Sequence, residues 1–321
     1  MPLKPVLWIT RALSANTMAR AREHYEVIAN DNDEPADAET IISRSAEADA
    51  CIPCHSESFT ADIAAQLDPR LKIIANHSVG VDHCDLPALQ KRGIVVTNTP
   101  DVLSDATAEI AMLLLLGAAR RAAEGDALVR NGEWSNWSPS FMVGHQVTGK
   151  RLGILGMGKV GQVMARRARG FDMQVHYHNR HKLPAELENG AIFHDSLDSL
   201  FEVSEFLSLH CPATDDTRGI IDAAALSKLP DRSIVINTAR GALINEADLL
   251  AAIDTGKLAA AGLDCFVQEP GGNPQFARCP NIFMLPHIGS ATYETRDAMG
   301  FRALDNLDAY FAGKEPQDRL V

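Results

Sequence analysis

Long apolar runs, positive charge and cysteine are all scarce in this sequence. The longest apolar run, IAMLLLLGAA at 110–119, is half the length of about 20 residues that a transmembrane helix needs, so we expect no membrane partner. Thirty Lys and Arg stand against 42 Asp and Glu, which gives a net charge of −12. Such a chain repels phosphate backbones and anionic bilayers, so we expect no nucleic-acid partner.

The N-terminal stretch MPLKPVLWIT lacks the apolar core of a secretory signal, and six cysteines are scattered over 321 residues. We therefore expect reduced thiols and a cytoplasmic location. CIPCH at 51–55 has the spacing of a c-type haem attachment site or of a redox dithiol. Haem attachment requires export, so the plainer interpretation is that Cys51 ends a strand and Cys54 lies in the loop after it.

Short apolar runs alternate with helix-like stretches along the chain. In the first part these runs are VLWIT (6–10), YEVIA (25–29), ACIP (50–53), LKIIA (71–75) and GIVVT (93–97). The alternation restarts with RLGILG (151–156), MQVHYH (173–178), EFLSLH (205–210), SIVIN (233–237), LAAAGLD (258–264) and NIFMLP (281–286). This pattern predicts an α/β fold with two doubly wound parallel-sheet domains, a flavodoxin-like substrate domain and a Rossmann domain of about six strands.

The predicted domains are a substrate-binding domain over 1–99, completed by a C-terminal helix within 290–321, and a dinucleotide-binding domain over 100–289. A helix is predicted over 102–122. It is apolar on nearly every side between Ala106 and Ala119, so we expect it to be buried between two bodies. The segment 131–150, rich in Gly, Ser, Asn and Trp, is interpreted as a long connection.

The sequence GILGMGKVG at 153–161 has the spacing G-x-G-x-x-G. The first glycine permits a tight turn, the second lets backbone amides approach a pyrophosphate, and the third lets helix and sheet pack closely. The motif follows an apolar strand and opens a helix, as dinucleotide binding requires. We predict cofactor contacts at Gly156, Met157, Gly158, Lys159, Val160 and Gly161.

The stretch after the second strand of this domain indicates which cofactor fits. HYHNRHK at 176–182 contains no carboxylate, but it offers Asn179 and Arg180. A carboxylate there would bind the ribose of NAD, whereas an arginine accommodates the 2′-phosphate of NADP. We expect NADP(H) to be preferred, with NAD(H) as the alternative. His176, His178 and His181 are joined by no Cys or carboxylate, so no metal site is predicted.

Three further segments follow apolar strands: NTARG (237–241), GLDCFVQEP (262–270) and LPHIGSAT (285–292). Ligands of open α/β sheets bind at the carboxyl ends of strands, so Arg240, Glu269 and His287 are expected to converge. With SVGVDHCD (78–85), TPDVLSDATAEIAM (99–112) and GMGKVG, these segments resemble the D-isomer-specific 2-hydroxyacid dehydrogenase family. The resemblance runs in order from about residue 71 to 292.

The resemblance implies that Arg240, Glu269 and His287 are catalytic. A guanidinium can bind the carboxylate of a 2-oxo acid and polarise its carbonyl. Hydride transfer to C2 leaves negative charge on the oxygen, and histidine is the natural proton donor near neutral pH. A carboxylate beside the imidazole holds its orientation and favours its protonated form, which is the role expected of Glu269.

The resemblance also implies the remaining site residues. Backbone amides of Val79 and Gly80 would bind the substrate carboxylate, and Asp264 would accept from the nicotinamide amide. The other implied cofactor contacts are Thr107, His210, Cys211, Pro212, Thr238, Ala239, His287 and Gly289.

The WSNWSP segment (134–139) and the HNR loop are most similar to the glyoxylate and hydroxypyruvate reductases, in which a Trp of this loop reaches a neighbouring subunit's active site. Trp137 is the candidate, and a role in filling a core or interface is equally open. We therefore expect an NADPH-dependent reductase of a small 2-oxo acid, acting as a homodimer formed through 102–150. Two alternatives remain: an NADH-dependent reductase of a D-lactate-type or branched 2-oxo acid, and a nucleotide-sensing protein like the C-terminal binding protein corepressors, which resemble the same family.

Overall fold

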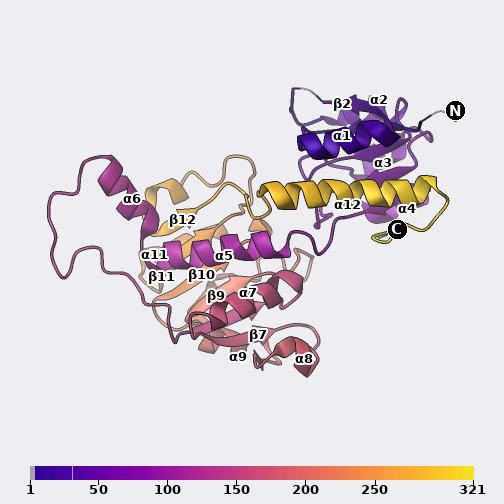
Figure 1. Cartoon of the computed structure of the whole chain (residues 1–321). Helices are drawn as coiled ribbons and strands as arrows, with labels where there is room; N and C mark the ends of the chain where they lie inside the picture. The colour runs from indigo at the N-terminus through magenta and orange to yellow at the C-terminus, as the bar shows by residue number, and fades with distance from the viewer. Residues whose placement is uncertain (1–3, 31) are drawn as a thin grey trace. The chain divides into compact units, whose positions relative to one another are not determined.

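The computed structural model describes residues 4–30 and 32–321 and divides into two compact units (Figure 1). Unit 1 comprises the chain up to Leu103 together with Ala291–Val321, and unit 2 comprises Ser104–Ser290. The C-terminal segment thus belongs to the same unit as the N-terminal part of the chain. The substrate-binding and dinucleotide-binding roles of the two parts stay predictions.

Unit 1 is built on a five-stranded parallel sheet. Its strands are β1 (Val6–Ile9), β2 (Glu26–Ala29), β3 (Ala50–Ile52), β4 (Ile73–Ala75) and β5 (Val95–Thr97). Its helices are α1 (Ala15–His24), α2 (Ala38–Ser45), α3 (Ala61–Gln66), α4 (Leu86–Lys91) and α12 (Tyr293–Phe311). The strand order β2-β1-β3-β4-β5 is that of the flavodoxin-like doubly wound fold.

Alternating side chains of the unit 1 strands face two separate hydrophobic cores. Leu7 and Ile9 pack under α1 and α12, whereas Trp8 between them points to the opposite core with α2, α3 and α4. Cys51 likewise faces the second core and its two strand neighbours face the first. A parallel sheet covered on both faces needs apolar residues at every strand position, which explains the continuous apolar runs.

Unit 2 is built on a parallel sheet of seven strands. They are β6 (Arg151–Leu155), β7 (Gln174–His178), β8 (Ile192–Phe193), β9 (Phe206–Leu209), β10 (Ser233–Asn237), β11 (Leu258–Leu263) and β12 (Ile282–Met284). The order β12-β11-β10-β9-β6-β7-β8 reverses direction between β6 and β9. This reversal is the topological switch point of a Rossmann fold, and ligands bind at its carboxyl edge.

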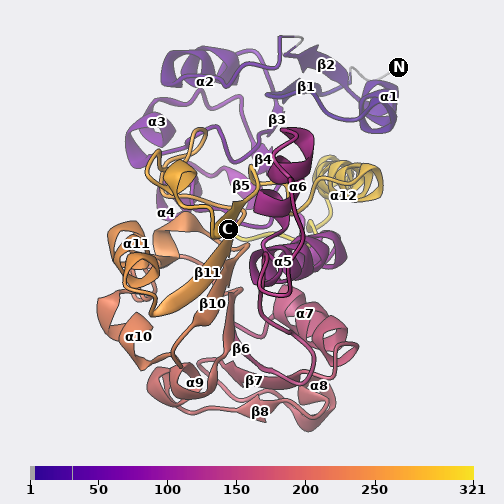
Figure 2. The same ribbon diagram turned by 90° about the vertical axis from the view of Figure 1, so that its left-hand side faces the viewer.

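Helices cover both faces of the seven-stranded sheet (Figure 2). The helices of unit 2 are α5 (Ser104–Ala119), α6 (Ala122–Arg130), α7 (Lys159–Arg169), α8 (Ala185–Glu188), α9 (Leu197–Val203), α10 (Ala223–Lys228) and α11 (Glu246–Asp254). One core joins α5 and α7 to one face of the sheet, and a second core joins α9, α10 and α11 to the other. The described residues contain no helix that is both long and apolar enough to cross a membrane.

The helix predicted over 102–122 is shorter in the structure, where it begins at Ser104, and it is more exposed than expected. It ends at Ala119, because Arg121 takes a left-handed backbone conformation with φ 56° and a second helix, α6, begins after it. It is also not covered on every side, since Leu113 is 45% exposed and Asp105 and Glu109 lie on the same exposed stripe. Small residues on its other faces let it pack against both the sheet and α7.

The sequence predicted about six strands in the second domain, and the structure has seven in its described residues. The additional strand, β8, has only two residues and pairs with β7 at the edge of the sheet. A two-residue strand is too short to produce a periodic apolar pattern in the sequence.

Candidate active site

The glycine-rich turn lies between β6 and α7 at the switch point of unit 2. Gly156 has φ 94°, and a Cβ atom there would lie 2.5 Å from the backbone nitrogen of Cys211. A Cβ atom on Gly161 would lie 2.5 Å from the carbonyl oxygen of Gly156. Gly158 is different, because a Cβ atom there would meet no atom within 4 Å. A side chain at the first or third glycine would therefore clash with the backbone, whereas the space beside the second glycine is free of described protein atoms.

Asn179 ties the end of β7 to this turn. Its Oδ1 atom accepts a hydrogen bond of 2.6 Å from the backbone N–H of Met157, whose side chain is buried in the core. Arg180, the next residue, is exposed. The nearby Lys182 lies 3.8 Å from Glu188, which also accepts a hydrogen bond from the Tyr177 hydroxyl. Arg180 and Lys182 are thus both exposed in the loop where the sequence predicts the 2′-phosphate.

The histidines of this region contact one another and the edge strand. Nδ1 of His176 lies 2.9 Å from Nε2 of His194. Nδ1 of His178 lies 2.8 Å from the carbonyl oxygen of His194. Burial lowers the pKa of both His176 and His194. These contacts attach β8 to β7 and so support the loop that begins at Asn179.

The turn that carries Arg240 is organised by Asn237 at the end of β10. The Asn237 side chain accepts from the backbone N–H of Ala239 at 3.0 Å and donates to the carbonyl oxygen of Arg240 at 2.8 Å. Asn237 is fully buried, and sequence reasoning missed it. The signal was present, because an Asn directly after an apolar strand often hydrogen-bonds the backbone two residues on.

Asp264 lies at the end of β11 and holds the segment that follows His287. Its two carboxylate oxygens accept from the backbone N–H groups of Ile288 at 2.8 Å and Gly289 at 2.7 Å. Burial raises its pKa in spite of these two bonds. A Cβ atom on Gly289 would lie 3.4 Å from the side chain of Thr107. The structure thus brings together Thr107, Asp264 and Gly289, which the sequence predicted as cofactor contacts.

His287 and Glu269 are paired. Nδ1 of His287 lies 2.6 Å from Oε2 of Glu269, and both side chains are partly exposed. The other carboxylate oxygen of Glu269 accepts from the backbone N–H of Phe266 at 2.7 Å. His287 itself has a left-handed backbone with φ 55°, an uncommon conformation for a residue other than glycine. The imidazole is therefore held by a carboxylate that is itself anchored to the backbone.

The Val79 and Gly80 amides belong to unit 1, after β4. The carbonyl oxygen of Ser78 accepts from Thr99 N–H at 2.9 Å, and that of Val79 accepts from the Asn98 side chain at 2.8 Å. A trans peptide places its N–H opposite its C=O. The N–H groups of Val79 and Gly80 therefore point away from residues 98 and 99.

The described residues of unit 2 contain features that fit a nicotinamide dinucleotide. The space beside Gly158 is open, and α7 begins there, so its first amides are available to a pyrophosphate. The hydroxyl of Thr238 and Nδ1 of His210 are buried and have no hydrogen-bond partner within the described part of the chain. Both residues follow strands at the carboxyl edge of the sheet, where a dinucleotide can supply polar partners.

The thiols of the CIPCH segment do not form a disulfide, and all six cysteines of the chain are free. Cys51 is buried in the core of unit 1, and burial raises the pKa of the Cys54 thiol to about 12. Thiolates are the reactive form in dithiol exchange. This environment therefore disfavours the redox interpretation of the segment.

Comparison with known proteins identifies the family. Residues 112–289 match the family model described as "D-isomer specific 2-hydroxyacid dehydrogenase, NAD binding domain". The chain is 43% identical over 314 residues to a glycerate dehydrogenase from Hyphomicrobium methylovorum, covering 97% of this chain and 98% of that protein. It is 39% identical over 319 residues to a glyoxylate reductase from Thermococcus kodakarensis, covering 98% and 95% respectively.

A solved structure gives the same result. An NADPH-dependent glyoxylate/hydroxypyruvate reductase from Sinorhizobium meliloti, in complex with NADP and malonate, superposes with a TM-score of 0.87 at 30% identity. The match covers 99% of this chain and 97% of that one. The predicted α/β fold and the family resemblance are both confirmed. This chain belongs to the D-isomer-specific 2-hydroxyacid dehydrogenase family of NAD(P)-dependent enzymes.

Proposed function

We propose that this enzyme reduces glyoxylate or hydroxypyruvate with NADPH, giving the 2-hydroxy acid, of D configuration where C2 is chiral. The observation that carries the proposal is the 2.6 Å contact between Nδ1 of His287 and Oε2 of Glu269. A proton donor held in this way at the carboxyl edge of a dinucleotide-binding sheet is what reduction of a carbonyl requires.

In the proposed reaction, bound NADPH supplies a hydride to C2 of the 2-oxo acid. The Arg240 guanidinium binds the carboxylate and polarises the carbonyl oxygen. Since Nδ1 of His287 faces Glu269, Nε2 is the ring atom that donates a proton to the carbonyl oxygen as charge develops there. In the reverse direction the same nitrogen takes the proton from the hydroxyl group.

Glu269 acts as the positioning partner of His287. Its Oε1 atom is fixed by the Phe266 N–H, which leaves Oε2 directed at the imidazole. The Val79 and Gly80 amides are proposed to bind the substrate carboxylate, because their N–H groups point away from the contacts that hold their carbonyl oxygens. Asp264 is proposed to keep the 287–289 segment in place and to accept from the nicotinamide amide.

The preference for NADPH is supported by the exposed Arg180 at the end of β7 and by the absence of a carboxylate from 176–182. The Sinorhizobium meliloti reductase is described as NADPH-dependent. The substrate is supported by the names of the relatives, one a glycerate dehydrogenase and another a glyoxylate reductase. Glycerate is the 2-hydroxy acid that reduction of hydroxypyruvate yields.

A homodimer is supported by the apolar surface of α6 and the segment after it, which extend from the body of unit 2 (Figure 1). Helix α6 has no buried residue, and Trp137 is 75% exposed. The exposed apolar side chains of this surface are Val129, Trp134, Trp137, Phe141 and Val143. Five exposed large apolar side chains within residues 129–143 favour burial against a second copy, with Trp137 reaching that copy's active site. Elution as a monomer at micromolar concentration contradicts this part of the proposal.

A cytoplasmic location is part of the proposal and is supported by the six free thiols, which persist in a reducing compartment.

Initial rates of NADPH and NADH oxidation with glyoxylate, hydroxypyruvate, pyruvate and a branched 2-oxo acid test the proposed function. Fast NADPH turnover with the first two acids supports it. Equal or faster turnover with NADH contradicts the cofactor preference and leaves the family unaffected. No turnover with any acid contradicts the reductase and favours a nucleotide-sensing role.

A further inference from the structure

A carboxylate is buried at the carboxyl edge of the unit 1 sheet. Glu57 is fully buried, and it follows β3, one strand away from the Val79 and Gly80 amides after β4. A buried carboxylate is costly unless hydrogen bonds and opposite charge compensate it. The contacts that compensate Glu57 show what it holds in place.

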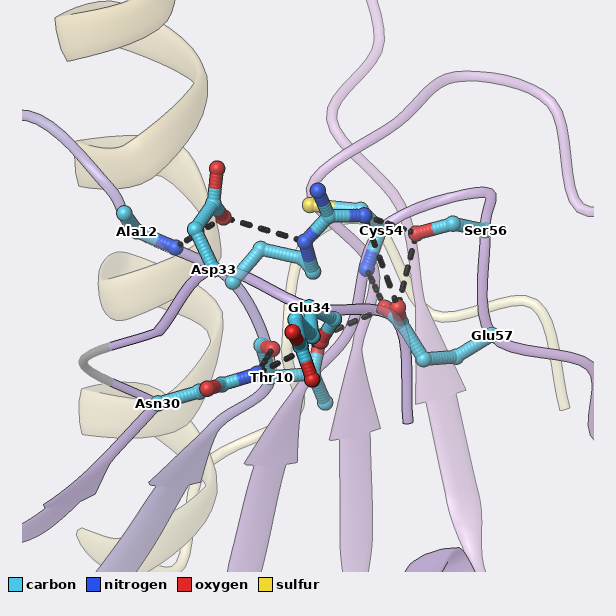
Figure 3. Close-up of polar contacts among 9 residues, drawn as sticks. Thr10, Ala12, Asn30, Asp33, Glu34, Cys54, Ser56 and Glu57 are labelled. Carbon is cyan, nitrogen blue, oxygen red and sulfur yellow. Dashed lines mark hydrogen bonds and ion pairs between the residues drawn. The ribbon is translucent and has the colours of Figure 1, made fainter. Parts of the chain in front are cut away.

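Glu57 receives hydrogen bonds from two different strand ends. Its Oε2 atom accepts from the Thr10 hydroxyl at 2.5 Å and from the Cys54 N–H at 2.9 Å. Its Oε1 atom accepts from the Ser56 hydroxyl at 2.7 Å. Thr10 directly follows β1, whereas Cys54 and Ser56 belong to the loop after β3. Figure 3 shows these side chains gathered beyond the ends of the strands.

The positive charge that faces Glu57 is oriented by a third segment. An Arg11 guanidinium nitrogen lies 4.0 Å from Oε1 of Glu57 and also donates to the Ser56 hydroxyl at 2.9 Å. Nε of Arg11 donates to Asp33 at 3.0 Å, and Asp33 also accepts from the Ala12 N–H. Arg11 is thereby kept beside the 54–57 turn rather than extended into solvent.

The turn held by Glu57 is bonded directly to the segment that leads to Val79 and Gly80. The carbonyl oxygen of Ile52 accepts from Thr10 N–H at 3.1 Å, and that of Pro53 accepts from His77 N–H at 2.9 Å. The backbone from residue 52 to 54 is thus fixed by Thr10 on one side, by His77 on the other, and by Glu57 at its end. Any shift of this backbone moves His77, two residues before Val79.

We propose that Glu57 is a positioning residue for substrate binding: its buried carboxylate fixes the 52–57 backbone and, through Pro53 and His77, the Val79 and Gly80 amides that receive the carboxylate of the 2-oxo acid. This inference rests on the proposed function of those amides. The groups that bind a substrate must be held within about 0.5 Å of their productive positions, which requires a rigid supporting layer. The buried cluster around Glu57 supplies that layer in unit 1.

The test compares Glu57→Gln with a matched carboxamide variant in the same sheet, Asp49→Asn. Asp49 also accepts a backbone N–H, that of Val6 at 2.8 Å, and pairs with Arg70 at 3.1 Å, but it lies at the amino edge of the sheet, just before β3. Two properties of the full-length enzymes are measured: steady-state kinetics with glyoxylate and NADPH, and hydrogen exchange of the His77 amide.

Glu57→Gln is expected to raise the KM for glyoxylate by about tenfold with kcat and the KM for NADPH nearly unchanged, because the amides bind substrate and transition state alike. The His77 amide is expected to exchange faster. Asp49→Asn is expected to leave both properties as in the wild type. If Glu57→Gln does not fold, Thr10→Val removes only one hydrogen bond to the same carboxylate and is expected to show a smaller change in the same direction.

An unchanged KM and unchanged exchange in Glu57→Gln overturn the inference, as does an equal change in Asp49→Asn, which would indicate general loosening of the sheet. Failure of the proposed function is distinguishable, because it appears as absence of turnover in the wild type. In that case the exchange of the His77 amide still decides whether Glu57 holds this backbone.

Discussion

Nδ1 of His287 lies 2.6 Å from Oε2 of Glu269, and Oε1 of the same carboxylate accepts from the Phe266 N–H. The histidine is therefore oriented by a group that the backbone already fixes. This arrangement explains how a partly exposed imidazole keeps one orientation, and it assigns the two ring nitrogens different tasks.

Replacing Glu269 with Gln removes the charge facing His287 and is expected to lower kcat by about 10²-fold, with little change in the KM for NADPH. Glu246→Gln is the matched control, because Glu246 accepts from the neighbouring Val267 N–H at 3.0 Å and does not contact His287. Steady-state kinetics of both variants check the prediction. Equal losses of kcat in the two variants would mean that the conformation of the loop around residues 266–269, rather than the carboxylate charge beside His287, determines the rate.

Alanine substitutions at two glycines of the nucleotide turn are expected to have different effects, one on cofactor binding and the other on stability. Gly158→Ala should leave the urea midpoint of unfolding unchanged and weaken NADPH binding, since a Cβ atom there meets no protein atom and would fill the cofactor's space. Gly161→Ala should lower the midpoint, because its Cβ atom would lie 2.5 Å from the Gly156 carbonyl oxygen. Normal NADPH affinity in a folded Gly158→Ala protein contradicts the placement of the cofactor.

Arg180→Asp is expected to reverse the cofactor preference, because a carboxylate at the end of β7 repels a 2′-phosphate and binds the ribose of NADH. The ratio of kcat/KM for NADPH to that for NADH should fall by about 10²-fold. Arg166→Asp serves as the control, since Arg166 is exposed in the same unit and pairs with Asp105. An unchanged ratio in Arg180→Asp removes this residue from cofactor selection.

Burial lowers the pKa of His77 and of His210 to about 4. Between about pH 6.5 and pH 4 the unfolded chain therefore binds more protons than the native protein at these positions, so the free energy of unfolding should fall as the pH decreases. The urea midpoint should be lower at about pH 5 than at about pH 7.5. His210→Asn should reduce this difference and His181→Gln, at an exposed position, should preserve it. A midpoint independent of pH contradicts the burial of these two imidazoles.

Much of the fold could be predicted because it depends on local patterns. Apolar strands such as Val6–Ile9 and the glycine turn at Gly156 produce signals within a few residues. The end of α5 could not be predicted, since Arg121 adopts a left-handed conformation that its residue type does not favour. The two-residue strand β8 depends on pairing with β7, which sequence periodicity does not record.

The candidate site shows the same limit. Arg240, Glu269 and His287 were expected to converge because each follows a strand, and the family resemblance implied that Glu269 pairs with His287. The structure brings Glu269 and His287 together. Glu57 was missed because its role depends on which backbone groups the fold places beside it. Asn237 was missed although its position at the end of an apolar strand is a local signal for its contact with the Ala239 N–H. Asn179 was expected at the 2′-phosphate, and its contact with the Met157 N–H is seen only in the folded structure.

The most direct test of the account is the initial rate of NADPH oxidation with glyoxylate and hydroxypyruvate, measured side by side for the wild type and His287→Ala. The wild type is expected to turn over both acids rapidly, and His287→Ala to lose about 10²–10⁴-fold of this rate while it still binds NADPH. Near-normal turnover by His287→Ala would contradict the proposed role of this histidine as the proton donor.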